Sequence, residues 1–91
     1  MINLFLALLS VTTLQLNKDW QLYENKPVIV TGKIVGIGIT YVLYLTDNVV
    51  ARITLEELRT ADKFKIGQKV KLKCTGAGYA FGGPLLLECS L

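Results

Sequence analysis

The spacing of apolar residues changes at Pro27, from a helical period to a period of two. In residues 11–24, apolar side chains recur every two to four positions, as on one face of an amphipathic helix. These side chains are Leu14, Leu16, Trp20 and Tyr23, and we expect the tryptophan to pack in the core. Thr12 or Thr13 can cap the start of the helix, and Asn25 precedes the proline that ends it.

After the proline, β-branched segments separated by glycine and turn residues predict five strands. The expected strands are residues 28–35, 41–45, 49–53, 69–74 and 84–89. Gly32, Gly36 and Gly38 interrupt the first strand and predict a bulge or a sharp bend. Asp47 and Asn48 predict a tight hairpin turn, because both tolerate a left-handed backbone.

The second half of the chain alternates more regularly. Between residues 69 and 74, Val70, Leu72 and Cys74 should face inward and the three lysines should face water. Residues 54–58 predict a short helix or a turn, Ile66 with Gly67 predicts a turn, and residues 76–83 predict a flexible tip. The element order predicts an all-β fold, a five-stranded OB-type β-barrel with an N-terminal helix and a short helical connection between strands three and four. Two sheets of a β-sandwich would need more strands.

Residues 1–10 are apolar and stand apart from a single OB-like domain over residues 11–91. This segment is either a signal peptide or an apolar docking segment. No Lys or Arg precedes it and no clear small-residue cleavage site follows, so a cytoplasmic location is slightly favoured over export. No apolar run reaches the ~18 residues that a membrane-spanning helix needs.

The two cysteines are expected to lie opposite each other. If the last two strands form a hairpin about Phe81 and Gly82, Cys74 faces Cys89 across it. Such a pair is close enough for a disulfide, and the alternative is two buried thiols in a reducing compartment.

Charge is concentrated in one part of the chain. Ten Lys and Arg residues against seven Asp and Glu give a net charge of +3. Six of the cations fall within fifteen residues, at Arg59, Lys63, Lys65, Lys69, Lys71 and Lys73, with only Asp62 against them. Such a field attracts polyanions, or it is a solubilising stripe. Histidine is absent, so histidine-based catalysis and histidine metal ligands are excluded. We therefore expect no enzyme, no cofactor and no metal site.

Three segments carry a family resemblance: VIVTGKIVGI, GQKVKLKCTGAG and LLLEC. From about Leu14 to Leu91 the chain resembles the tRNA-anticodon-binding-like OB-fold family of small bacterial and phage proteins. The resemblance implies an N-terminal helix before a glycine-bent strand and paired late cysteines. It also implies nucleic-acid binding by analogy of fold.

OB barrels bind ligands across the second and third strands and the flanking loops. The candidate residues for single-stranded nucleic acid are Tyr41, Tyr44, Arg52, Lys69, Lys73, Tyr79 and Phe81. Tyr41 and Tyr44 are three apart and so point to opposite faces of a regular strand. Lys69 and Lys73 lie on the fourth strand, where they either extend a phosphate track or protect a strand edge. The alternative function is a protein-interaction module, exported or phage-encoded, that binds a protein partner.

Overall fold

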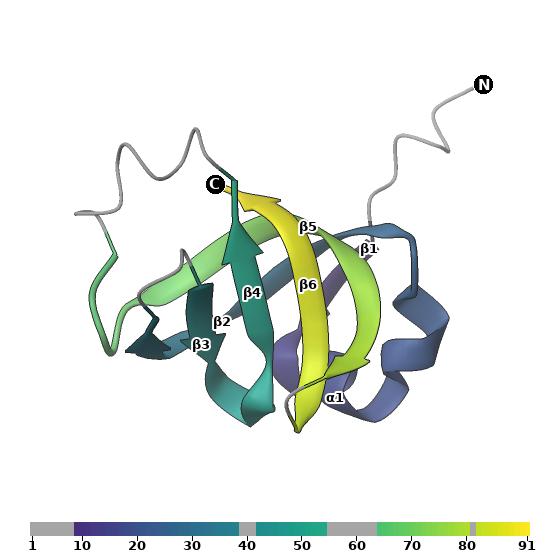
Figure 1. Ribbon diagram of the computed structural model, residues 1–91, viewed down its shortest axis with the longest axis horizontal. Coiled ribbons are helices and arrows are strands. Elements are labelled where there is room, and N and C mark those ends of the chain that lie inside the picture. The colour runs from purple at the N-terminus through teal and green to yellow at the C-terminus, as the bar shows by residue number, and fades with distance from the viewer. Residues whose placement is uncertain (1–8, 39–41, 55–63, 81) are drawn as a thin grey trace.

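Residues 9–38, 42–54, 64–80 and 82–91 are described by the computed structural model (Figure 1). The elements are β1 (Leu9–Thr12), α1 (Thr13–Asp19), the 3₁₀ helix η2 (Trp20–Tyr23), β2 (Pro27–Ile37), β3 (Val42–Leu45), the 3₁₀ turn η3 (Thr46–Asn48), β4 (Val50–Ile53), β5 (Lys69–Ala80) and β6 (Gly83–Ser90). Of the short helix or turn expected over residues 54–58, all but Thr54 lie outside the described residues.

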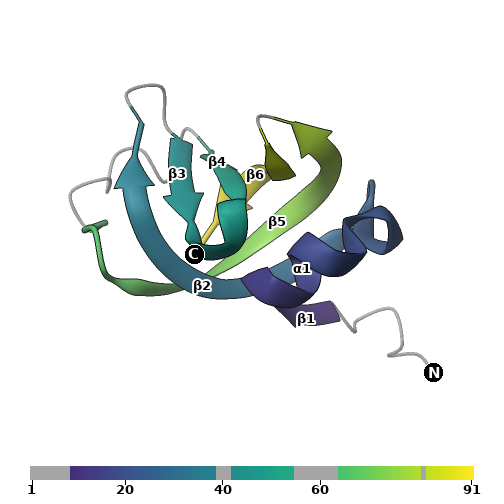
Figure 2. The ribbon, with the colours of Figure 1, turned by 90° about the horizontal axis from the view of Figure 1, so that it is seen from below.

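Five strands close into a barrel, which confirms the predicted OB-type fold. β2, β3 and β4 form an antiparallel meander, β4 pairs with β6 in parallel, β6 pairs with β5, and β5 returns to β2. In the end-on view of Figure 2, β2 and β5 cross one side of the barrel while β3, β4 and β6 lie on the other. Alternating side chains from all five strands fill the interior, among them Val28, Ile34, Leu43, Leu72 and Leu86.

The long strand β2 belongs to both sides of the barrel because it bends. Its first half pairs with β5, and its last residues pair with β3. The register shifts between Ile34, which faces Leu45, and Gly36, which faces Tyr44. Val35 is therefore the extra residue of a bulge, at the position where glycine spacing predicts one.

The helix begins as predicted and ends early. Thr12 caps α1, and its side chain and the side chain of Gln15 form a reciprocal capping box. Leu16 is fully buried against the barrel, whereas Leu14 is 51% exposed. The expectation that Leu14 belongs to a buried apolar stripe was wrong. The α-helix is only seven residues long and is followed by the 3₁₀ helix η2, so the stripe does not continue along one regular helix.

One strand was not predicted. β1 pairs in parallel with residues 28–31 of β2, and its Val11 side chain is buried. The described part of the domain therefore begins at Leu9, two residues before the boundary expected from the sequence. Two parallel strands are joined by a helix rather than by a tight turn, so no hairpin signal marks the pairing of β1 with β2. The four residues of β1 are also too few to show a clear strand pattern.

The glycine-rich segment at residues 76–83 was expected to be a flexible tip, and this was wrong. β5 continues to Ala80 and β6 begins at Gly83, so most of the segment is paired strand. Two of its glycines allow close backbone approach: a Cβ atom on Gly76 would overlap the Tyr23 carbonyl, and one on Gly83 would overlap the Asn48 carbonyl. These glycines serve packing rather than flexibility.

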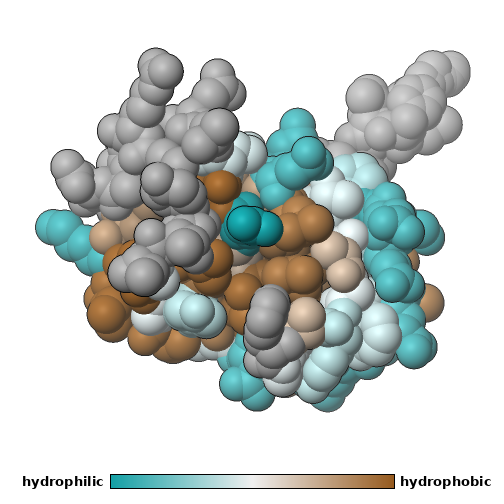
Figure 3. All heavy atoms as spheres, viewed as in Figure 1, coloured by the Kyte–Doolittle hydropathy of each residue, from teal (hydrophilic) through white to brown (hydrophobic). Residues whose placement is uncertain are grey.

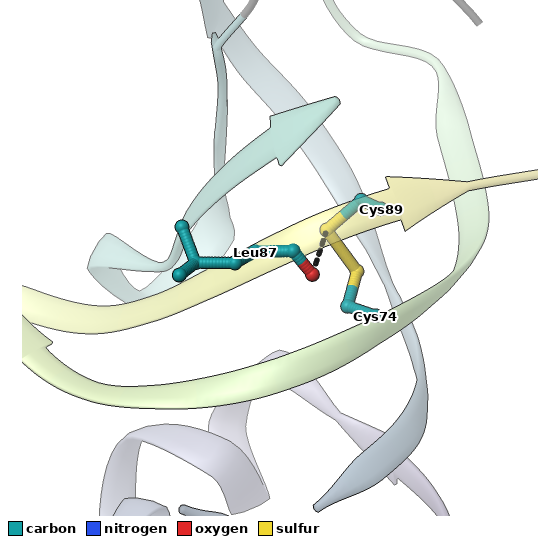
Figure 4. Close-up of a disulfide and its surroundings, with 3 residues drawn as sticks. All are labelled: Cys74, Leu87 and Cys89. Carbon is teal, nitrogen blue, oxygen red and sulfur yellow. Dashed lines mark hydrogen bonds between the residues drawn. A yellow bond between two sulfur atoms is a disulfide. The ribbon is translucent and has the colours of Figure 1, made fainter. Parts of the chain in front are cut away.

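Cys74 and Cys89 join β5 to β6 (Figure 4). Their sulfur atoms lie at disulfide distance, their Cα atoms are 4.2 Å apart, and both side chains are buried. Lys73 faces Ser90 in the register expected for the hairpin, and the cysteines follow at a shift in that register. The expected proximity of the two cysteines is confirmed.

Candidate ligand-binding face

Tyr44 lies on the outer face of β3, and its ring covers Gly36 of β2 and Gly38, which comes just after that strand. A Cβ atom on Gly36 would sit 3.3 Å from the ring carbon Cδ2, and one on Gly38 would sit 3.3 Å from Cε2. The ring therefore rests against β2 where side chains are missing, and Tyr44 remains 44% exposed. An aromatic ring supported on one side and open to solvent on the other can stack with a planar group.

Arg52 is the cation next to this ring. Val50 faces Tyr44 across the β3–β4 ladder, and Arg52, two residues further on, faces Val42. Diagonal neighbours on paired strands lie about 7–8 Å apart, within reach of a tyrosine ring and a guanidinium group. Arg52 is exposed while Ala51 and Ile53, on either side of it, are buried. The strand therefore directs the guanidinium group outward.

The surroundings of Tyr44 and Arg52 are apolar. Val35, the bulge residue of β2, is 56% exposed and lies beside the tyrosine, whereas Ile37 faces buried Leu43 on the inner side of the sheet. Figure 3 shows hydrophobic side chains gathered over β3, β4 and β6. An open depression of about 130 Å³ is lined by Val35, Tyr44, Leu45, Asn48, Val49 and Val50. We call the outer surface formed by Val35, Tyr44 and Arg52 the Tyr44 face.

Lys69 and Lys73 do not lie on the Tyr44 face. They are on β5, where they alternate with buried Val70 and Leu72, as predicted. β5 pairs with the first half of β2, on the side of the barrel away from β3 and β4 (Figure 2). The closed barrel thus separates the two predicted lysines from the predicted tyrosine and arginine.

Tyr79 belongs to a third place, at the end of the barrel. A register shift between Gly76 and Tyr79 sets the tyrosine opposite buried Pro84. Its ring centroid lies 5.4 Å from that of Trp20 in η2, and its hydroxyl donates to the Gly82 carbonyl oxygen at 3.1 Å. Trp20 is thus half-buried against Tyr79 rather than in the barrel core. Tyr79 holds η2 to the hairpin, away from the Tyr44 face.

Tyr41 and Phe81, the other two predicted site residues, lie outside the described residues. Sequence reasoning missed Val35 and Ile37 as surface residues, and it treated Gly36 and Gly38 only as bends. The spacing of two between the glycines was a usable signal, because it puts both on one face of a strand.

No protein-family model matches this chain, and no curated protein matches it either. Within the described ranges, no three His, Cys, Asp or Glu residues are grouped so that they could hold a metal ion. Among the same residues, no helix has the length and apolar character needed to cross a membrane.

Proposed function

We propose that this protein is a non-enzymatic OB-fold binding module that takes single-stranded nucleic acid on the Tyr44 face. The observation that carries the proposal is the supported, half-exposed ring of Tyr44 with Arg52 one strand away. A base stacks on the ring, and the guanidinium group neutralises a neighbouring phosphate. The resemblance to the tRNA-anticodon-binding-like family agrees with this use of the second and third barrel strands.

The test is fluorescence anisotropy with labelled single-stranded DNA and RNA at low and moderate salt. Stacking contributes about 1–3 kcal/mol per base, so Tyr44→Ala should weaken binding about 5- to 150-fold. Tyr44→Phe should bind nearly as well as the wild type, because it keeps the ring. Arg52→Gln should reduce the slope of log K against log salt by about 0.7.

Tyr79→Ala is the matched control. It removes another exposed tyrosine, 52% exposed, from the end of the barrel. Its affinity should equal that of the wild type once circular dichroism shows that both are folded. Equal losses in Tyr44→Ala and Tyr79→Ala would refute a site on the Tyr44 face, as would an absence of binding at low salt.

A protein partner is the second candidate, and the exposure of Val35 beside Tyr44 favours it. Apolar side chains at the centre of a surface are typical of protein interfaces. Val35→Ser separates the two functions. Nucleic-acid binding through Tyr44 and Arg52 should survive this substitution, whereas association with a protein through the apolar surface around Val35 should be lost.

A further inference from the structure

Four lysines form a second surface on the β2–β5 side of the barrel. Lys69, Lys71 and Lys73 are exposed at alternate positions of β5, and Lys33 on β2 faces Lys69 directly. Alternate residues of a strand lie about 7 Å apart, so the three β5 lysines form an evenly spaced row. We call the three lysines of β5 the lysine row.

The strand paired with the row offers it no opposite charge. Across the β2–β5 ladder, Lys73 faces Ile29, Lys71 faces Thr31 and Lys69 faces Lys33. Two like charges directly opposite each other in a sheet are destabilising. On the other side of β5, Lys73 faces Ser90, and the nearest acidic side chain along β6 is exposed Glu88. The row is thus a local concentration of positive charge, and an anion bound there would relieve its repulsion.

The form of the row matches an extended anion. Val70, Leu72 and Cys74 alternate with the lysines and are buried in the core, so the strand holds the Cα atoms of the lysines at a fixed spacing. A linear chain of phosphate groups can lie along such a row and make successive contacts, with release of its counterions.

We propose that the lysine row is a binding surface for an extended chain of phosphates. The shared chemistry is that of a nucleic-acid backbone and of inorganic polyphosphate. The inference does not rest on the Tyr44 face, because it needs no base and lies on the other side of the barrel.

The experiment measures binding of long-chain inorganic polyphosphate and of labelled oligo-dT over a range of salt concentrations. The variant is Lys71→Gln with Lys73→Gln, and the control is Lys18→Glu, which lowers the net charge by the same two units from α1. The double variant should lose affinity for both ligands, and its salt slope with oligo-dT should fall by about 1.4. Lys18→Glu should keep most of the affinity and the full slope.

The outcomes separate this inference from the nucleic-acid proposal. Binding of polyphosphate that is insensitive to Tyr44→Ala supports the lysine row even if base stacking fails. Equal losses in the lysine double variant and in Lys18→Glu would overturn it, since net charge alone would then explain binding. Binding to phosphatidylglycerol vesicles without binding to polyphosphate would also overturn it, and would indicate a membrane surface instead.

Discussion

Reduction of the Cys74–Cys89 disulfide should cost this domain a large part of its stability. The bridge closes a segment with a sequence separation of 15 residues, for which loop-closure entropy predicts a stabilisation of about 3 kcal/mol. Domains are stabilised by roughly 0.05–0.15 kcal/mol per residue, or about 5–14 kcal/mol for a chain of this length. The loss of one bond would therefore remove between a fifth and more than half of the total.

Urea unfolding with and without reductant measures the loss. With an m-value of about 1 kcal/mol/M, the midpoint should fall by about 3 M on reduction, and m should rise because the open chain exposes more surface. Both thiols stay in the reduced protein, so this comparison isolates the cross-link from packing. The double variant Cys74→Ala with Cys89→Ala should be slightly less stable than the reduced wild type, because two small apolar groups are also lost. Its stability should be the same with and without reductant. A shift below about 0.5 kcal/mol would refute the reasoning, and would mean that the β5–β6 hairpin stays formed in the denatured chain.

Three further substitutions test single features of the fold by the same unfolding assay. Gly83→Ala should lower the free energy of unfolding by about 1–3 kcal/mol, because the added Cβ atom would overlap the Asn48 carbonyl. Gly67→Ala is the control, because only a positive φ opposes that change. A smaller loss of stability in Gly83→Ala than in Gly67→Ala would contradict this reasoning. Thr13→Val should lower the free energy of unfolding by about 1–3 kcal/mol. The buried Thr13 hydroxyl donates to Asp47 Oδ2 at 2.8 Å and lies 2.8 Å from Thr46 Oγ1, and valine would lose both contacts. Thr13→Ser keeps the hydroxyl and should retain most of the stability. Lys33→Glu should stabilise the protein by a few tenths of a kcal/mol at low salt, because repulsion from Lys69 becomes attraction. A gain in stability that persists at high salt would argue against an electrostatic cause.

Local features of the fold were predictable where one residue type has one strong conformational reason. Asp47 and Asn48 both have positive φ, at 59° and 61°, and they form the predicted turn. The alternation of lysines with Val70 and Leu72 survives unchanged in β5. In these cases the physical cause, a tolerated backbone conformation or a buried face, acts within a few residues.

Features that depend on distant pairing could not be predicted in the same way. β1 is a strand only because residues 28–31 accept it as a parallel neighbour. The glycines at 76 and 83 look like loop residues until the Tyr23 and Asn48 carbonyls are placed against them. The predicted ligand residues were divided for the same reason: closure of the barrel sends β5 to the side opposite β3 and β4, whatever the order of residues along the chain.

This division changes what a binding experiment can mean. A single ligand-binding face would make aromatic and lysine substitutions act together, with interaction energies between neighbouring contacts. Here Tyr44 and Lys73 sit on opposite sides of the barrel, so their effects on a short oligonucleotide should be independent. If an oligonucleotide is long enough to pass around the barrel, each of the two substitutions weakens its binding. The double variant then binds more weakly than either single variant. The dependence of the two effects on oligonucleotide length therefore distinguishes one ligand that contacts both faces from two separate ligands, one for each face.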